Sequence, residues 1–305
     1  MRLFLLLIMV VMLSGCQRRD PNAVLREELE HFAADKDARI GIAVIINGTD
    51  TIMVNGYEDF PMLSVYKFPQ SLAIADFCKR HQLSFTDSVN INADEIKLAT
   101  WSPMRDNYGV RNLRLPIAEL LAYTLQQSDN NACDILFRLI GSPAVADSLM
   151  HTLGFTDIHI LSTEDEMHLD TSLCYANSAS PIEMARLIDL FNSDLRQESP
   201  LYEQIAELME NCRTGTDRLA RPLTSANVIF GHKTGTGDVN SEGRIIAIND
   251  VGYVNQTNNF RYAIAVFISD SASDMETTSQ MIAEISEIVF NYVSDSYRGD
   301  TIGLN

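Results

Sequence analysis

Ser64 and Lys67, three residues apart, could act as a nucleophile and the base that activates it. Apolar residues recur through residues 64–80 at helical spacing, so we expect a helix on which residues three apart share one face. A serine hydroxyl is a poor nucleophile until a base takes its proton. An amine in a cleft that disfavours its charge is one such base, and a helix N-terminus favours a developing oxyanion. The spacing alone is a weak signal, because an N-cap serine beside a solvated lysine has the same pattern.

Two more motifs occur further along the chain. Residues 128–130 read Ser-Asp-Asn at the start of a helix-like run, and residues 233–235 read Lys-Thr-Gly at the end of a strand-like run. Ser-x-x-Lys followed by these two motifs is the signature of class A β-lactamases and penicillin-binding proteins. The chain therefore resembles a class A serine β-lactamase, in its cephalosporinase-like branch, over roughly residues 22–295.

The resemblance implies an acyl-enzyme mechanism that uses neither a metal nor a cofactor. At the family's Glu-Pro-Glu-Leu-Asn segment this chain has Glu-Asp-Glu-Met-His, in residues 164–168. Matched in this way, Glu164 activates the water that releases the acyl group, Glu166 is structural, and His168 replaces the asparagine that helps to hold that water. Either Lys67 or Glu164 is the acylation base. The implied catalytic residues are Ser64, Lys67, Ser128, Glu164 and Lys233.

The same resemblance implies a substrate-binding set. Asn130 would bind the substrate amide and orient Lys67, and Trp101 would form the cleft edge, a core tryptophan being the alternative. Arg218 would bind the substrate carboxylate, a surface ion pair being the alternative, since strand alternation turns Arg244 to the other face. The backbone N–H groups of Ser64 and Thr236 would form an oxyanion hole. The implied substrate-binding residues are Trp101, Asn130, His168, Arg218, Thr234, Gly235 and Thr236.

Glu164 separates the possible activities. A penicillin-binding protein and a lactamase both acylate serine, but only the lactamase needs a base that hydrolyses the ester quickly. We therefore expect hydrolysis of β-lactams, with cephalosporins preferred. A D,D-peptidase is the alternative enzyme, and an envelope β-lactam sensor is the non-enzymatic alternative.

Composition and the N-terminus bear on partners and location. The net charge of −18 argues against nucleic acid as a partner. One arginine precedes the apolar residues 3–13, and Leu-Ser-Gly-Cys at residues 13–16 looks like a bacterial lipobox. We expect a signal peptide over residues 1–15 and acylation of Cys16, which anchors a monomeric protein in the bacterial envelope, with the outer membrane favoured. Secretion to the periplasm with an unmodified Cys16 is the alternative.

The remaining cysteines do not suggest a metal site. Cys78, Cys133, Cys174 and Cys212 show neither Cys-x-x-Cys nor Cys/His spacing, and their pairing cannot be deduced from the sequence.

Asp129, in the Ser-Asp-Asn motif, is expected to cap the helix that follows it.

Helical patterns fill the middle of the chain and strand patterns lie near both ends. The strand patterns are residues 40–46 and 51–55, joined at Asn47-Gly48, and residues 228–232, 244–254 and 260–269. We expect one antiparallel five-stranded sheet flanked by the terminal helices, with an inserted all-α domain, which is the family's α/β (α+β) fold. The expected division is a linker at residues 16–21, an α/β domain of residues 22–61 and 213–297, and an all-α domain of residues 62–212. Residues 161–180 are expected to be a long loop.

Overall fold

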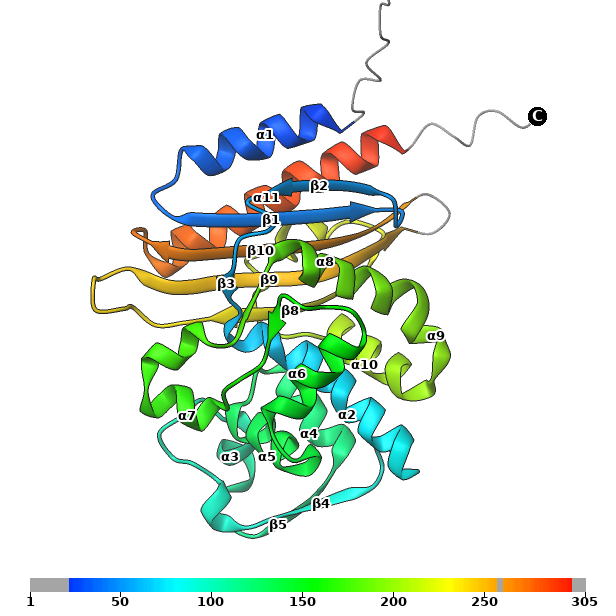
Figure 1. The fold of residues 1–305 in the computed structure, drawn as a ribbon, viewed down its shortest axis with the longest axis vertical. Helices are drawn as coiled ribbons and strands as arrows, with labels where there is room; N and C mark the ends of the chain where they lie inside the picture. Colours follow the sequence, from blue (N-terminus) through cyan, green and yellow to red (C-terminus); the bar gives the residue numbers. More distant parts are fainter. Residues whose placement is uncertain (1–21, 257–259, 298–305) are drawn as a thin grey trace, which may run out of the picture.

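A five-stranded antiparallel sheet forms one layer of this computed structural model, which describes residues 22–256 and 260–297 (Figure 1). The order of its strands is β2-β1-β10-β9-β8. The predicted signal peptide and Cys16 lie outside the described residues. The sheet consists of β1 (Arg39–Ile46), β2 (Asp50–Val54), β8 (Ile229–Thr236), β9 (Ile245–Gln256) and β10 (Phe260–Ser271).

Both faces of this sheet are covered, which explains the nearly unbroken apolar sequence of β1. Ile42 and Val44 pack into the core under α1 (Ala23–Ala34) and α11 (Met275–Ser296). Ala43 and Ile45 belong to the core on the opposite face. Successive side chains of a strand point to opposite faces, so a strand that is buried on both sides needs apolar residues at every position.

Strands from the first and the last part of the chain pair in the centre of the sheet. Strand β1 pairs with β10 from Arg39 opposite Ser269 to Ile46 opposite Tyr262. Asn47 and Gly48 both have positive φ, 52° and 76°, as a tight turn between β1 and β2 requires. The expected hairpin, the antiparallel sheet and its terminal helices are therefore confirmed, and so is the fold class.

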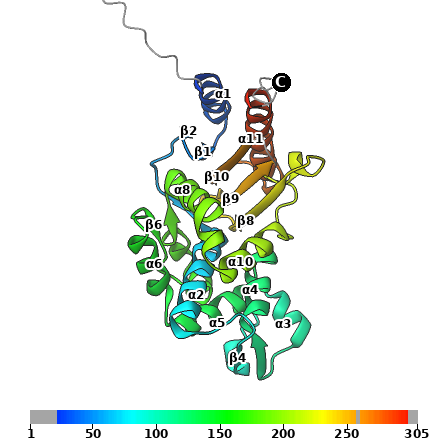
Figure 2. The same cartoon turned by 90° about the vertical axis from the view of Figure 1, so that its right-hand side faces the viewer.

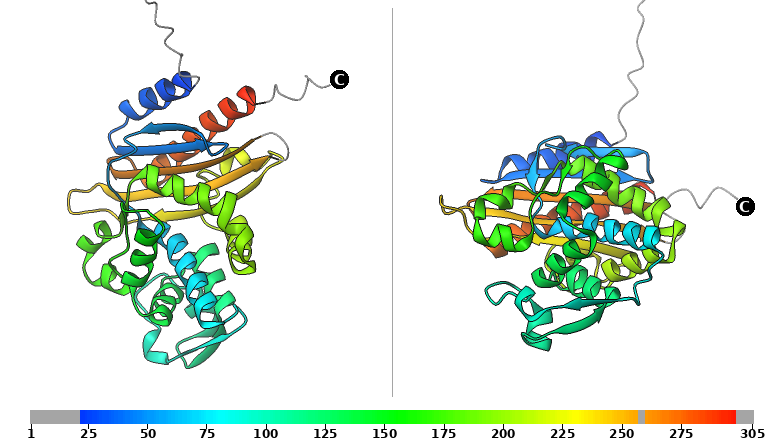
Figure 3. Two further views of the ribbon diagram at one scale, coloured as in Figure 1. Left: turned by 45° about the vertical axis from the view of Figure 1, so that its right-hand side comes forward. Right: turned by 60° about the horizontal axis from the view of Figure 1, so that its bottom comes forward.

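A mainly helical region lies on one side of the sheet, with α2 running through its middle (Figure 2 and Figure 3). Helix α8 packs back against β1 and β10, so it joins this region to the sheet. The helices are α2 (Lys67–His81), α3 (Pro103–Tyr108), α4 (Ile117–Gln126), α5 (Asn130–Ile140), α6 (Pro143–Thr152), α7 (Glu164–Leu169), α8 (Pro181–Leu190), α9 (Arg196–Glu198) and α10 (Pro200–Glu210).

The helical region is less purely helical than expected. It carries two small antiparallel sheets, one of β4 and β5 and the other of β3, β7 and β6. Their strands are β3 (Phe60–Pro61), β4 (Ser88–Ile91), β5 (Leu113–Pro116), β6 (Ile158–His159) and β7 (Ser178–Ala179). Short turns of other helix types are η1 (Leu63–Tyr66), η2 (Ala93–Glu95), η3 (Thr171–Tyr175), η4 (Phe191–Leu195) and η5 (Arg221–Leu223).

Two expectations about local structure were inaccurate. The helix expected over residues 64–80 begins as the 3₁₀ turn η1 and becomes α-helical only at Lys67. The segment expected to be a loop over residues 161–180 contains α7, because Thr163 and Glu166 form a reciprocal capping box at its start. In the part of the chain that the structure describes, no helix combines the length and apolarity needed to cross a membrane.

Candidate active site

Ser64 stands at a strained point of the backbone where the sheet meets the helices. Leu63, the residue before it, has φ of 48°, a left-handed conformation that is costly for a branched side chain. Turn η1 then leads into α2, which places Lys67 three residues after Ser64. Strand β8 approaches this turn closely, since a Cβ on Gly235 would lie 2.5 Å from the backbone oxygen of Met62. Gly235 therefore allows the sheet edge to reach the serine.

A cleft of about 400 Å³ opens between β8, α7 and the start of α5. Most of the predicted site residues line it: Ser64, Trp101, Ser128, Asn130, Glu164, His168, Thr234 and Thr236. Lys67 and Lys233 are completely buried behind this lining. Trp101 is 62% exposed, which excludes a core tryptophan, and its Nε1 donates to the backbone oxygen of Gln127.

Lys67 is surrounded by acceptors. Its Nζ lies 2.7 Å from Asn130 Oδ1, 2.9 Å from the backbone oxygen of Ser128 and 2.9 Å from Glu164 Oε1. These match the three donors of an ammonium group. Burial disfavours the charge, but the Glu164 carboxylate and the nearby Cys133 together outweigh burial and raise the pKa of Lys67. In the protein without substrate these neighbours therefore favour the charged amine.

One oxygen of Glu164 is the centre of the site. Besides the Lys67 amine, Oε1 accepts the hydroxyl of Tyr66 at 2.9 Å and that of Ser64 at 3.5 Å. The Glu164 side chain is only 12% exposed, so the carboxylate points into the cleft and not to bulk solvent. A carboxylate held by a cation and a hydroxyl, next to a serine, is placed to accept a proton.

Sequence reasoning overlooked Tyr66. This side chain is completely buried, and its oxygen also lies 3.4 Å from Cys133 Sγ. Burial, followed by the negative neighbours, raises the pKa of Tyr66 well above its usual value, so the phenol stays protonated and can donate. A polar aromatic residue between Ser64 and Lys67 was the available signal.

Two side chains, the half-buried Asp134 and the buried Asn177, anchor the segment that carries Glu164. Asp134 accepts the backbone N–H groups of Glu164 and Asp165, both at 2.9 Å. Asn177 accepts the N–H groups of residues 161 and 162 at 2.7 and 2.9 Å and donates to the carbonyl of Ser162. Asp134 lies four residues after Asn130, on the same face of α5, and could have been found by that spacing. Asn177 is distant in sequence from its partners and gives no local signal.

Glu166 and His168 have different positions on the short helix α7. Glu166 caps the helix by accepting the Thr163 N–H at 2.8 Å, so its expected structural role is confirmed. His168 follows Glu164 by one turn and lines the same cleft.

Ser128 and Lys233 meet on the other side of the cleft. Ser128 has φ of 57°, and its hydroxyl accepts from Lys233 Nζ at 3.1 Å. Burial, together with the nearby Lys67 cation, lowers the pKa of Lys233 to about 7. Asp129 caps α5 through the Ala132 N–H at 2.8 Å and is completely buried, as expected for a structural cap.

Arg218 lies behind Thr236. It is buried, which excludes a surface ion pair, and its guanidinium donates to Thr236 Oγ1 at 2.8 Å and to the backbone oxygen of Gly235 at 2.9 Å. Gly235 itself does not line the cleft. Arg244, which precedes β9, instead binds Asp37, which precedes β1.

The predicted oxyanion hole is compatible with the sheet. The Lys233 amine donates to the backbone oxygen of Thr234 at 2.8 Å, so that carbonyl faces the cleft. In an antiparallel ladder alternate residues direct both backbone polar groups to the same side. The N–H of Thr236 therefore also points to the cleft, on the edge strand β8, toward the start of η1.

A buried charged cluster lies under β8. His232 Nδ1 is 2.9 Å from Asp250 Oδ1. Despite burial, the Asp250 carboxylate raises the pKa of His232 to about 10. Despite burial, the His232 cation lowers the pKa of Cys212 to about 7. All four cysteines in the described residues are free, and Cys133 is completely buried in the core.

Comparisons with known proteins agree with this geometry. The profile of the family described as "Beta-lactamase enzyme family" matches residues 23–293. A β-lactamase of Phocaeicola vulgatus is 36% identical over 270 residues, covering 88% of this chain and 84% of that protein. The β-lactamase VEB-1 of Pseudomonas aeruginosa is 36% identical, covering 87% and 89%. The crystal structure of a class A β-lactamase from Bacteroides cellulosilyticus superposes with a TM-score of 0.84 at 32% identity, covering 89% of this chain and 97% of that one.

Proposed function

The chain belongs to the beta-lactamase enzyme family, as a class A serine enzyme. We propose here how its residues hydrolyse the β-lactam amide. The observation that carries the proposal is the convergence of Ser64, Tyr66 and Lys67 on a single oxygen of Glu164. The proposed mechanism requires neither a metal nor a cofactor.

Glu164 is the proposed base for acylation. Lys67 already directs its three N–H donors at acceptors and is held as the cation, so it offers no lone pair to the serine. Ser64 Oγ attacks the lactam carbonyl carbon while its proton passes to Glu164. The oxyanion is received by the N–H groups of Ser64 and Thr236, each such donor contributing about 3–4 kcal/mol.

Ring opening and ester hydrolysis complete the cycle. Ser128 gives its proton to the lactam nitrogen as the C–N bond breaks, and Lys233 holds its hydroxyl at 3.1 Å. The proton that Glu164 took from Ser64 passes through Lys67, which lies against both Glu164 and Ser128, to the Ser128 oxygen, so Glu164 is ionised again. Glu164 then takes a proton from a water molecule that attacks the Ser64 ester, and it gives that proton to the Ser64 oxygen as the ester C–O bond breaks. A base in this position contributes about 10²–10⁴-fold to the rate.

Substrate contacts follow from the cleft lining. Asn130 binds the substrate amide, and Trp101 closes the edge of the cleft. The Thr234 and Thr236 hydroxyls bind the substrate carboxylate, with Arg218 supplying positive charge through Thr236. Cephalosporins are the preferred substrates in this proposal, which steady-state kinetics over penicillins, cephalosporins and carbapenems would test.

Intact-protein mass spectrometry with a cephalosporin tests the mechanism. We expect the wild type to turn over, Glu164→Ala to accumulate the acyl adduct, and Ser64→Ala to form none. Glu166→Gln is the matched control, because it removes a neighbouring negative charge while the amide oxygen can still accept the Thr163 N–H that caps α7. Rapid turnover by Ser64→Ala would refute the mechanism. A long-lived adduct on the wild type, unaffected by Glu164, would instead indicate a D,D-peptidase or a sensor.

For location, we propose a monomer anchored in the envelope through acylated Cys16. The lipobox-like residues 13–16 support this proposal. Acyl chains give membrane affinity through buried CH₂ groups. Cys16→Ala should move the protein from the membrane fraction to the soluble periplasm, and an unchanged distribution would contradict the anchor.

A further inference from the structure

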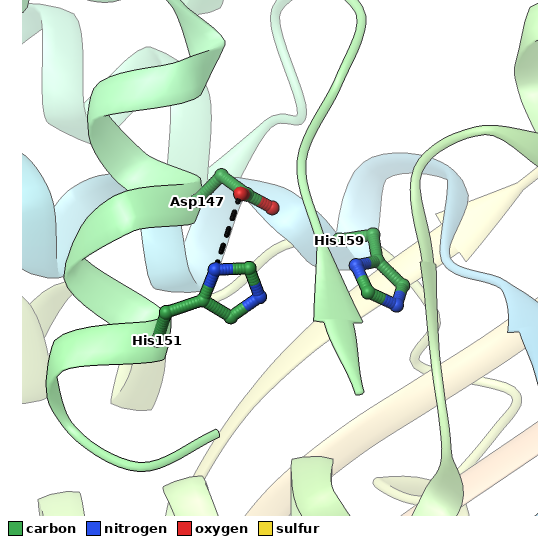
Figure 4. A group of neighbouring side chains, drawn as sticks. All are labelled: Asp147, His151 and His159. Atoms are coloured by element: carbon green, nitrogen blue, oxygen red, sulfur yellow. Dashed lines mark ion pairs between the residues drawn. The ribbon is translucent and has the colours of Figure 1, made fainter. Parts of the chain in front are cut away.

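Asp147, His151 and His159 gather at a place that the proposed reaction does not use (Figure 4). Asp147 and His151 lie one turn apart on α6, and His159 faces them from strand β6. One ligand atom from each residue lies within 4.8 Å of the others. We propose that these three side chains form a binding site for a divalent transition-metal ion such as Zn²⁺.

The chemistry of the three groups suits zinc. Imidazole nitrogen and carboxylate oxygen are zinc ligands at about 2.0–2.2 Å, whereas calcium and magnesium require oxygen ligands. His151 Nδ1 lies 3.6 Å from Asp147 Oδ2. Two ligands at these bond lengths and that separation subtend about 120° at the ion, near the tetrahedral range. Water would complete the coordination, since His151 remains 44% exposed.

The fold holds the ligands before any ion arrives. The other oxygen of Asp147 accepts the backbone N–H of Ile160 at 2.9 Å, which turns Oδ2 toward His151. Helix α6 is fixed by Ala146 and Met150, both completely buried in the core. His159 is fixed by its position opposite Ser178 in the small sheet.

A side-chain movement is then needed. Two ligands of a tetrahedral zinc ion lie about 3.4 Å apart, so a pair as far apart as 4.8 Å must close by about 1.4 Å. Rotation of the exposed His151 side chain at the last turn of α6 can supply this movement.

A third ligand distinguishes this group from an ordinary surface pair. His31 and Asp35 have the same i,i+4 relation on α1, at 3.9 Å. The described residues place no third His, Cys or carboxylate within ligand distance of that pair. In contrast, His159 reaches the α6 pair from a different element, so an ion here would join α6 to β6.

This link has a consequence for the Glu164 segment. The chain continues from β6 through Ile160, whose N–H donates to Asp147, and reaches α7 at Glu164. A bound ion would therefore reinforce the start of the segment that carries the catalytic carboxylate, without touching substrate. We expect zinc to slow amide hydrogen exchange in residues 158–163.

Calorimetry and thermal unfolding of the purified protein, after treatment with EDTA, test the site. We expect one zinc ion per chain, no binding of Mg²⁺, and a Tm increase of about 5 °C at a hundredfold excess of zinc over Kd.

Variants locate the ion. His159→Asn and His151→Gln should each weaken zinc binding at least tenfold, while His31→Gln, the matched pair without a third ligand, should bind as the wild type does. The metal-free Tm and the hydrolysis rate show that each variant is folded. Zinc binding that survives in His159→Asn would overturn the proposal, and inhibition of hydrolysis in that variant would place the ion near His168 in the cleft instead.

Discussion

Replacing Tyr66 by phenylalanine removes one hydroxyl and changes the volume of the core very little. That hydroxyl is 2.9 Å from Glu164 Oε1, inside a completely buried side chain. A hydrogen bond to a charged group contributes about 1.5–3 kcal/mol. Tyr66→Phe should therefore lower the free energy of unfolding at pH 7 by about this amount.

The same loss should be visible in catalysis. Tyr66 donates to the carboxylate oxygen that also faces Ser64, so without this hydroxyl the oxygen loses one of the groups that hold it in place. We expect kcat/KM at pH 7 to fall by up to about tenfold, which corresponds to about 1.4 kcal/mol. The loss is limited because Lys67 still holds the carboxylate.

Tyr253→Phe provides a matched control. Tyr253 is also completely buried, and its hydroxyl also donates to a glutamate Oε1 at 2.9 Å, that of Glu210. We expect a similar loss of stability and no change in kcat/KM. The two measurements are urea unfolding and kcat/KM for a chromogenic cephalosporin at pH 7. An unchanged kcat/KM in Tyr66→Phe would show that the hydroxyl does not act on the catalytic base.

Four other perturbations test separate parts of the structure. Asn177→Ala leaves two N–H groups without their acceptor and should cost about 2–5 kcal/mol in urea unfolding while lowering kcat, because the Glu164 segment loosens. Lys233 has a pKa lowered to about 7, so kcat/KM for an anionic cephalosporin should fall as pH rises above about 7; a flat profile to pH 9 would contradict its role as the cation. Trp101→Ala should raise KM severalfold while changing Tm by less than about 2 °C, since the ring is 62% exposed. The Asp250 carboxylate raises the pKa of His232 from 6.5 to about 10. The ion pair therefore stabilises the fold fully below pH 6.5, and this contribution is lost as the pH rises through 10. Between pH 6 and pH 10 the free energy of unfolding should fall less in His232→Gln than in the wild type.

The sheet and its terminal helices could be predicted because their signals are local. β-rich runs at both ends, the Asn47-Gly48 turn and the apolar stripes of the first and last helices are readable within a few residues. The division into two domains stays a prediction. The short helix α7 could not be predicted by periodicity, because it has only 6 residues and depends on the Thr163 capping box.

The nucleophile, the motifs and the carboxylate that faces them could be predicted from the sequence, because Ser64 and Lys67 are related by helical spacing and the other motifs are short and contiguous. The charges of these groups could not be predicted, because they depend on the folded arrangement. The cation on Lys67 depends on Glu164, which belongs to a segment about a hundred residues away. The anchors Asp134 and Asn177 and the hydroxyl of Tyr66 became visible only when that segment was placed over α5. A proton affinity depends on what surrounds a group in three dimensions, and residues distant in the chain supply most of those surroundings here.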